Sequence, residues 1–423
     1  MTGEQVGQQA EGQVGEPPRV RGRARFAAYA TLLGDRPART FSLTGFVARL
    51  PQSMTGIGLV LLVSLTTGSF GRAGIVAGTV TAGSAVAAPL WGRVIDRVGQ
   101  GRVLAGTSVG YAAGILLVLA SVEHAWPFAA TVGGAALAGL SFTPTGGCVR
   151  ARWSHRLSGS PLLDVAFAVE AVLDEVTFVV GPVLVTFLAT AVGPDVGLIT
   201  CAVLGVLGAV ALAVQRGTEP PRHPRPERGV ARDRLPVPLL ASVVVACCAL
   251  GGVFGGMEVV VVAFAREHRI LSSAGLLLMC WAAGSMVAGL VAGVLTWRRS
   301  PVTRFRIGAA ALAVTLLPVP FVGLPGLLGA LLVLNGLAIA PTLIAEVSVV
   351  QAAVPAPRLT EALGWSGTGL AGGVAIGAAV SGAAVDGLGS VGGFGTVAAF
   401  AVLLALATLL VRDPGPRGAQ PAR

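Results

Sequence analysis

Lysine is absent from the sequence, and charged residues of either sign are few. Only 12% of the 423 residues are charged, whereas an ordinary soluble domain carries about 25%. A soluble chain with so few charges could not cover itself with polar surface, but lipid tails solvate an apolar exterior. Because a phosphate-binding loop of the form G-x-x-x-x-G-K-[ST] needs lysine, the sequence also argues against an ATP-driven pump made of this chain alone.

Residues that carry catalytic or metal chemistry are equally scarce. The five cysteines lack the spacing of metal ligands and lie in or beside apolar segments, so we interpret them as small core residues. No constellation of His, Asp or Ser gathers at one membrane face, as a membrane enzyme would require. We therefore predict a protein that is not an enzyme and has no catalytic residues, no metal site and no cofactor.

Apolar residues and glycine are abundant instead. Hydrophobic residues make up 54% of the chain, the mean hydropathy is +0.79, and 60 residues are glycine. A helix needs about 20 mostly apolar residues to cross the hydrocarbon core of a bilayer. We count twelve such runs and predict an all-α membrane protein with twelve transmembrane helices, at about residues 41–67, 71–93, 102–121, 126–148, 163–190, 195–215, 237–264, 272–296, 304–322, 324–348, 361–386 and 388–411.

A stretch rich in Pro and Arg divides these runs into two groups of six. Residues 216–236 cannot bury a core, so we interpret them as a cytoplasmic linker between two six-helix bundles, residues 41–215 and 237–411. The ends of the chain, residues 1–40 and 412–423, are polar and are predicted to be cytoplasmic tails.

The arginines indicate the orientation in the membrane. Nearly all of them lie on the side of the tails and the linker, and the opposite loops hold only Arg72, Arg266 and Arg269. Because basic loops stay in the cytoplasm, we predict a multi-pass protein of the plasma (inner) membrane with both termini inside. This placement explains the basic residues better than nucleic-acid binding does.

Short patterns recur in the two groups of six. Ala82-Gly83-Ser84 recurs as Ala283-Gly284-Ser285, and Gly139-Leu140 with Pro144-Thr145 recurs as Gly336-Leu337 with Pro341-Thr342. Parallel repeats of this kind place a substrate site near the bilayer midplane, between the two halves.

A further pattern follows the second apolar run, in Gly92-Arg93-Val94-Ile95-Asp96-Arg97-Val98-Gly99-Gln100-Gly101-Arg102. It resembles the helix 2–3 loop signature of the major facilitator superfamily, G-x-x-x-D-R-x-G-R-[RK]-[RK]. The departures are Gln100 and Gly101, and the matching positions are Gly92, Asp96, Arg97, Gly99 and Arg102. The resemblance implies a transporter that works by alternating access, most similar to drug and metabolite efflux members. It also implies a monomer whose partners are membrane lipid and a small-molecule substrate.

Asp96 is expected at the cytoplasmic end of the second helix, as part of a gating loop. A carboxylate there can accept hydrogen bonds from a helix N-terminus in the other half, where the helix dipole favours negative charge. Such a contact would close the cytoplasmic side. The alternative is a basic loop that only sets the topology and happens to contain one acid.

Pro and Gly positions predict helix shape. Pro51, Gly181 and Pro182 are candidate kinks, because a proline in a transmembrane helix frees a carbonyl and permits bending. The Gly181-Pro182 pair resembles the antiporter pattern of the same family and favours export, although a plain packing kink explains it as well. A stripe of small residues on one helical face should let another helix approach closely; it contains Gly369, Gly373 and Gly377.

Ionisable residues inside the apolar runs are costly and therefore candidates for function. They are Arg49, Glu170, Asp174, Glu175 and Glu258. Their depths along the first and fifth helices predict that Arg49 pairs with Glu170 or Asp174. Two roles remain open: a structural ion pair, or a coupling site in which a surplus carboxylate binds a proton.

Two transport functions follow from these features. The first is a proton-coupled exporter of a small organic molecule. The second is an uptake carrier for a polar or anionic metabolite, with Arg49 as the charge partner of the substrate.

Overall fold

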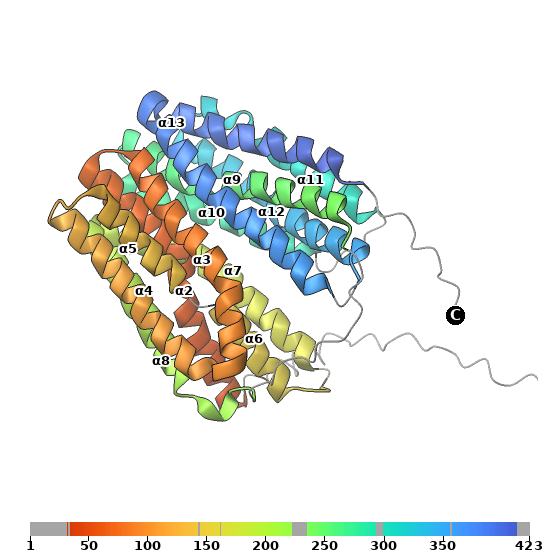
Figure 1. Ribbon diagram of the computed structural model, residues 1–423. Coiled ribbons are helices and arrows are strands. Elements are labelled where there is room, and N and C mark those ends of the chain that lie inside the picture. Colours follow the sequence, from red (N-terminus) through yellow and green to blue (C-terminus); the bar gives the residue numbers. More distant parts are fainter. Residues whose placement is uncertain are drawn as a thin grey trace, which may run out of the picture.

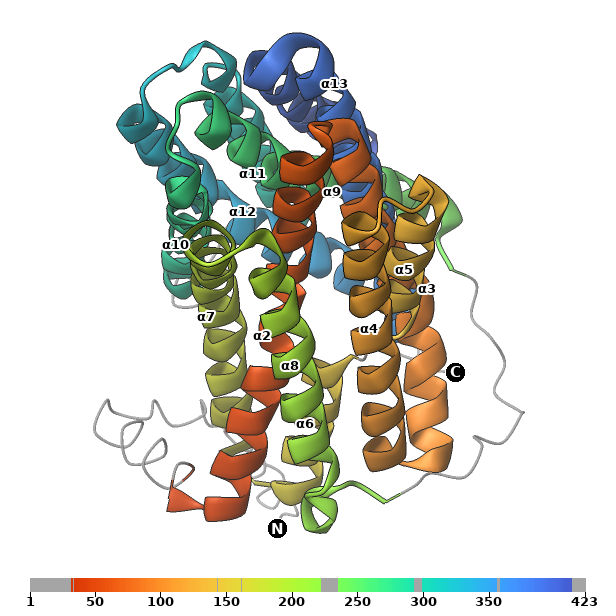
Figure 2. The same ribbon diagram turned by 90° about the vertical axis from the view of Figure 1, so that its left-hand side faces the viewer.

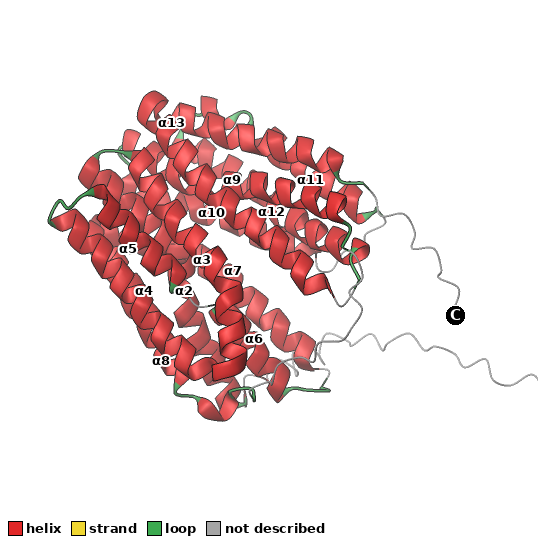
Figure 3. Cartoon of the chain, in the orientation of Figure 1, coloured by secondary structure: helices red, strands yellow, loops and turns green. Residues whose placement is uncertain are grey.

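The computed structural model describes residues 32, 34–142, 144–160, 162–221, 235–292, 299–355 and 358–412, and every regular element within these ranges is a helix (Figure 3). Ten of these helices are long and apolar enough to cross a membrane. An all-helical fold is the expected outcome for an apolar chain in lipid, since only helices and closed barrels satisfy all backbone polar groups there.

The described residues of the first half form seven α-helices. They are α2 (Arg36–Thr67), α3 (Phe70–Val98), α4 (Gln100–Glu123), α5 (Phe128–Leu140), α6 (Thr145–Arg156), α7 (Leu162–Ala191) and α8 (Pro194–Ala213). A short 3₁₀ turn, η1 (Arg216–Thr218), begins the predicted linker, of which residues 222–234 lie outside the described residues.

In the second half, five α-helices lie within the described ranges. They are α9 (Val237–Glu267), α10 (Ala274–Ala292), α11 (Pro301–Leu316), α12 (Pro325–Ala353) and α13 (Leu359–Leu410). Two 3₁₀ turns connect them, η2 (Leu271–Ser273) and η3 (Val319–Phe321). Figure 1 shows the two halves as separate groups of helices that converge at one end.

The count of ten differs from the predicted twelve in two places. The run predicted at residues 126–148 is broken after Leu140 and resumes at Thr145 as the polar helix α6. The runs predicted at 361–386 and 388–411 are joined in α13, whose backbone leaves the helical region at Gly389 with φ 67°. A glycine without a Cβ reaches this positive φ without strain, so it can turn the chain between two helices.

The two arms of α13 lie against each other. Figure 1 shows its ribbon folding back on itself, and Ser381 Oγ lies 2.6 Å from Thr396 Oγ1 on the other side of the turn. We call residues 359–388 the first arm and residues 390–410 the second arm.

Two helices extend beyond the apolar runs predicted for them. α2 begins at Arg36, inside the predicted tail, and α3 continues to Val98, so Gly92, Asp96 and Arg97 lie on a helix rather than in a loop. Only Gly99, with φ 98°, separates α3 from α4. The hydropathy signal ends where the chain leaves the hydrocarbon, whereas backbone hydrogen bonds continue into the aqueous layer.

Contacts between the halves join α3 to the first arm of α13 and α7 to α10. Figure 2 shows α10 beside α7. A Cβ atom on Gly74 of α3 would overlap the carbonyl oxygen of Ala378, and one on Gly275 of α10 would overlap that of Pro182. The halves therefore meet with backbone against backbone, as small residues allow in lipid.

The predicted repeat has a structural counterpart. A Cβ atom added to Gly83 of α3 would lie 3.1 Å from the Cα of Gly139 on α5. In the second half, one added to Gly284 of α10 would lie 3.1 Å from the Cα of Gly336 on α12. The recurring sequence patterns thus make the same helix contact twice.

Candidate functional site

Arg49 on α2 is the centre of a buried ion-pair network. Its side chain is 2% exposed; Nη2 lies 2.5 Å from Oε2 of Glu170, and Nη1 lies 2.7 Å from Oδ1 of Asp174. Both carboxylates come from α7, one helical turn apart. The predicted pairing of Arg49 with one of these acids is confirmed, and the guanidinium in fact bridges both.

Further donors complete the network. Glu170 is fully buried and also accepts hydrogen bonds from Ser42 Oγ at 2.5 Å and Trp153 Nε1 at 2.9 Å. Asp174 also forms an ion pair with a second arginine, Arg150, whose Nη2 donates a hydrogen bond to Oδ2 at 2.5 Å. The sequence had assigned Arg150 to a loop and missed it. Two carboxylates therefore face two guanidinium groups, and neither acid is in surplus.

The remaining predicted acids lack such partners. Within the described residues, Glu175 and Glu258 form no hydrogen bond or ion pair. A Cβ atom on Gly56 of α2 would lie 2.6 Å from Oε2 of Glu258, which is on α9. Glu258 thus sits where the first and last halves of the chain touch, deep within both helices.

Glu346 on α12 was overlooked in the sequence. The side chain is 5% exposed, its Oε1 atom is buried without a hydrogen-bond partner, and Cys247 and Ser366 lie beside it. The available signal was a single carboxyl near the end of the run predicted at residues 324–348.

Asp386, at the end of the first arm of α13, joins the two halves. Its carboxylate accepts hydrogen bonds from the backbone N–H groups of Phe70 at 2.6 Å and Gly71 at 2.9 Å, and from Ser69 Oγ at 2.7 Å. An acid from the second half therefore caps the N-terminus of α3 in the first half. Nearby, Arg266 Nη1 donates to the carbonyl of Ser64 at 3.0 Å. Sequence reasoning missed this contact because it requires the tertiary arrangement.

The opposite end of α3 carries the residues of the family signature. Asp96, Arg97 and Arg102 are exposed and form no hydrogen bond or ion pair within the part of the chain that is described. At this end of α3, Asp96 makes no contact of the predicted kind with the other half among the described residues. At the other end of α3, Asp386 joins the two halves.

The two departures from the signature have partners of their own. Gln100 Oε1 accepts a hydrogen bond at 2.8 Å from Nε of the fully buried Arg152, which also donates to Thr218 Oγ1 at 2.8 Å. Burial lowers the pKa of the Arg152 guanidinium, but the group stays charged near neutral pH. An arginine in place of Gln100 would be repelled by the positive charge of Arg152 and could not accept its hydrogen bond. A Cβ atom on Gly101 would lie 3.0 Å from the carbonyl oxygen of Ala213.

The predicted kink and packing residues lie at helix contacts. Gly181 faces Ser53 of α2, and Ser53 Oγ donates to the carbonyl of Thr177 at 2.7 Å. Cβ atoms on Gly373 and Gly377 would overlap backbone carbonyls of α9, and one on Gly369 would lie 2.7 Å from the Val244 oxygen. The small-residue stripe is thus a seam against α9. Pro51 lies within α2 and borders a pocket.

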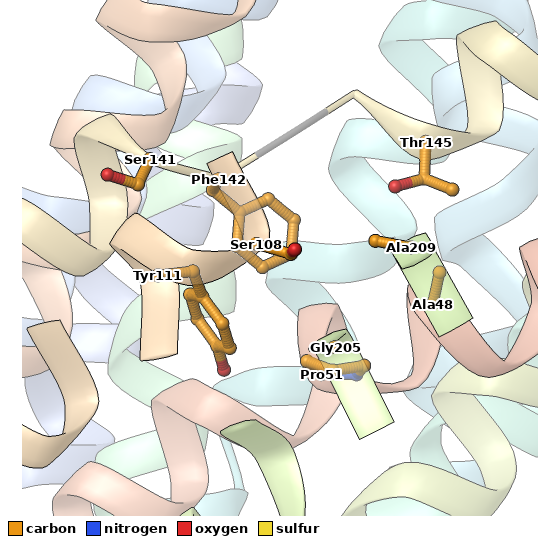
Figure 4. A pocket seen from close by; sticks show the side chains of 9 residues that line it. All are labelled: Ala48, Pro51, Ser108, Tyr111, Ser141, Phe142, Thr145, Gly205 and Ala209. Atoms are coloured by element: carbon orange, nitrogen blue, oxygen red, sulfur yellow. The ribbon is translucent and has the colours of Figure 1, made fainter. Parts of the chain in front are cut away.

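That pocket lies inside the first half, between α2, α4, α8 and the break after α5 (Figure 4). It is lined by Ala48, Pro51, Ser108, Tyr111, Ser141, Phe142, Thr145, Gly205 and Ala209. The hydroxyl of Tyr111 is 2.6 Å from Thr55 Oγ1, and its ring packs edge to face with Phe142. Hydroxyl groups and one aromatic pair suit water or a small polar group, and no charged side chain lines the pocket.

The described residues contain no group of three or more His, Cys, Asp or Glu that could hold a metal ion. The ionisable side chains of the candidate site are carboxylates and guanidinium groups, which can bind or release protons and can pair with charged solutes.

A profile of the Major Facilitator Superfamily matches residues 41–332 and 260–423 of the chain. No curated protein matches the sequence. Among solved structures, a point variant of the nucleoside transporter NupG aligns with a TM-score of 0.74 and 15% identity, over 89% of this chain and 100% of that chain.

Two other solved structures show the same fold. The human organic anion transporter MFSD10 (TETRAN) aligns with a TM-score of 0.58 and 17% identity, over 94% of this chain and all of its own. A bacterial homologue of the iron transporter ferroportin, in an inward-facing state, aligns with a TM-score of 0.67 and 16% identity, over 88% and 98% of the two chains. At such low identity the likeness concerns the fold.

Proposed function

Because the chain belongs to the major facilitator superfamily, we propose that it is a secondary active transporter that exports a small organic molecule in exchange for protons by alternating access. The multi-pass membrane architecture and the two halves that meet at one end supply the moving parts. An enzymatic role would need reactive groups that the described residues do not assemble.

The proposed topology has twelve crossings with both termini in the cytoplasm of a cell bounded by the plasma (inner) membrane. In this scheme α5 with the break after it is one crossing, and the two arms of α13 are two more. The basic loops support this orientation, and on it the Asp386 contact closes the outer side. The transporter is proposed to work as a monomer in lipid.

Glu258 is the observation that carries proton coupling. It lies against Gly56 of the opposite half and has no hydrogen-bonding or ionic partner among the described residues. Rocking of the halves would change its surroundings, so a carboxyl at this position would meet different solvent in the two states. Glu170 and Asp174, by contrast, are saturated by Arg49 and Arg150 and suit a structural role.

One feature supports export, and another supports a weakly charged substrate. The Gly181-Pro182 pair, which resembles the antiporter pattern, packs at a contact between halves, since the Pro182 carbonyl meets Gly275. The solved relatives are named for nucleosides, organic anions and iron. This range leaves the substrate to be found by a screen, and the scarcity of charge favours amphipathic organic molecules.

The purified protein in liposomes that contain a pH-sensitive dye tests the proposal. The pH is set lower on the side opposite the cytoplasmic face of the protein, so that protons are driven toward the cytoplasmic face. At least one member of a panel of amphipathic amines, nucleosides and carboxylic acids should then accelerate proton movement. Sodium should have no effect. Glu258→Gln should abolish this acceleration and retain substrate exchange at equal pH, because a neutral amide cannot carry the proton.

Glu361→Gln is the matched control, because Glu361 is an exposed acid paired with Arg358 at the start of α13. It should behave like the parent protein. A sodium requirement, or wild-type coupling in Glu258→Gln, would overturn the proposed mechanism.

Uptake of an anion remains the competing function and is an outcome of the same assay. Arg49, its proposed charge partner, is buried and engaged with two carboxylates, which leaves an anion little access to it. Uptake driven by a carboxylic acid gradient and lost in Arg49→Gln with folding intact would favour this alternative.

A further inference from the structure

Glu346 is a buried carboxyl that the mechanism proposed above does not use. It lies on α12, about 10 Å from the end of the helix at about 1.5 Å per residue. The side chain is 5% exposed and its Oε1 atom has no hydrogen-bond partner. An ionised carboxylate left so in a low-dielectric interior is strongly disfavoured, unless a cation or a proton joins it.

Among the described residues, Glu346 forms no ion pair. α9 contributes the thiol of Cys247 beside the carboxyl, and the first arm of α13 contributes the hydroxyl of Ser366. On α11, Arg306 is held by the carbonyls of Thr408 and Val411 at the end of the second arm of α13. Within the part of the chain that is described, no arginine pairs with Glu346 as Arg49 pairs with Glu170.

The internal repeat shows that the helix contact does not need an acid. Matching Pro144-Thr145 with Pro341-Thr342 places Val149 at the position of Glu346. Val149 is buried on α6 and packs against Gly45 of α2, since a Cβ atom on Gly45 would overlap its Cγ2 methyl. The corresponding contact in the second half is that of α12 with α9, where the side chain of Glu346 lies beside Cys247. An apolar residue serves the first half, so the carboxyl of the second half has a role other than packing.

We propose that Glu346 is a proton-binding site in the second half of the transporter. A metal cation is a poorer ligand here, because hard cations require several oxygen ligands, whereas the neighbours are one hydroxyl and one soft thiol. A proton needs only the carboxyl itself. Binding forms one O–H bond with a proton taken from water, and release returns that proton to water, with no other reactant.

Occupancy of this site can be measured without a substrate. Infrared difference spectra of the purified protein in lipid nanodiscs, recorded between acidic and alkaline pH, report the C=O stretch of protonated carboxyl groups. The wild-type protein should show a band of a weakly hydrogen-bonded carboxylic acid that disappears at alkaline pH and shifts in D₂O. Glu346→Gln should lose this band, and Glu361→Gln should retain it.

Two further variants keep the test decisive. Glu346→Val introduces the residue that the first half has at the equivalent position, Val149, so this variant should fold. It should also lose the band, and the result would then stand even if Glu346→Gln folded poorly. Cys247→Ala should shift the band without removing it. An unchanged spectrum in Glu346→Val, or a band that sodium displaces at constant pH, would overturn the proposal.

The role of this proton in transport rests on the proposed function, but its binding does not. In the liposome assay, Glu346→Gln should reduce protons moved per substrate while Glu258→Gln still abolishes coupling. A titrating Glu346 band in a protein that couples nothing to protons would reject the transport mechanism and leave the binding site standing.

Discussion

The same pair of helices is held together in two different ways in the two halves. In the first half, α2 and α7 are joined by Arg49, which bridges Glu170 and Asp174. In the second half, α9 and the first arm of α13 occupy the corresponding places in the repeat, and their contact contains no ion pair within the described residues. It is a seam of glycines, including Gly251, Gly255 and Gly373, each against a carbonyl of the facing helix.

The difference assigns stability and function to different residues. A buried ion pair requires both partners, because removal of one leaves an uncompensated charge in a low dielectric. A glycine seam requires only small size, which leaves the acids of that half free for other tasks. Glu258 and Glu346, both in the second half, have no arginine partner among the described residues. The ion pairs around Arg49 therefore stabilise the first half, whereas Glu258 and Glu346 are the candidate proton sites of the second half.

The largest effect is expected from removing the arginine of the first half. Arg49→Gln leaves the fully buried Glu170 without a guanidinium and should lower the free energy of unfolding by about 3–5 kcal/mol. Thermal unfolding and monodispersity of the purified protein in detergent measure this loss. Glu346→Gln, the comparable change of a buried charge in the second half, should cost less than about 1 kcal/mol.

A second substitution separates charge imbalance from lost packing. Arg49→Gln combined with Glu170→Gln removes the stranded acid and should recover part of the lost stability. If Arg49→Gln alone unfolds at the wild-type temperature, the ion pair is not what holds α2 to α7, and the comparison fails for the first half.

The glycine seam should respond to size rather than charge. Gly373→Ala places a methyl group on the carbonyl of Cys248 and should destabilise the protein by about 2 kcal/mol, through separation of α9 from α13. Gly372→Ala is the matched control: its Cβ meets nothing within 4 Å, and alanine favours the helix by about 0.5–1 kcal/mol. Unfolding temperatures of the two variants should therefore move in opposite directions. Equal shifts would contradict a close seam at Gly373.

Depth along a helix was the part of the site that sequence could predict. Arg49, Glu170 and Asp174 lie in uninterrupted helices, where a constant rise converts residue number into position, so their pairing followed from spacing alone. Arg150 was missed because α6 begins after an unpredicted break and carries the arginine back toward Asp174. The break falls at Ser141-Phe142-Thr143-Pro144-Thr145, which is more polar than the preceding residues and contains a proline, and the run predicted at residues 126–148 passed over this signal.

Contacts between the two halves could not be predicted from the pattern. Asp386 is the last residue of the run predicted at residues 361–386 and was not singled out in the sequence, but in the fold it lies at the start of α3. The signature residues showed the reverse limit: Asp96 was recognised by spacing, but its partner depends on which end of the molecule is closed. Sequence thus predicted the helices and a charge pair within one half, while partners in the opposite half required the packed structure.

Asp386 allows the smallest and most specific test, because it belongs to the second half and accepts hydrogen bonds from the first half. Asp386→Asn keeps an oxygen for the Phe70 N–H and loses the negative charge at the helix terminus, at a cost of about 1–1.5 kcal/mol. The closed state of the end at which Asp386 lies should then become about tenfold less favoured relative to the open state. Hydrogen–deuterium exchange of the first turn of α3 should rise accordingly.

Asp195→Asn provides the control for this change, because Asp195 lies in the first turn of α8 and its carboxylate lies beside Gly193 of the same half. It should leave exchange in α3 unaltered. The Asp386 variant should also become more protected near Asp96, at the other end of the same helix, since opening one end of two rocking halves closes the other. Faster exchange at both ends would instead mean that Asp386 holds the fold together, and that the second half, like the first, uses a charge as a lock.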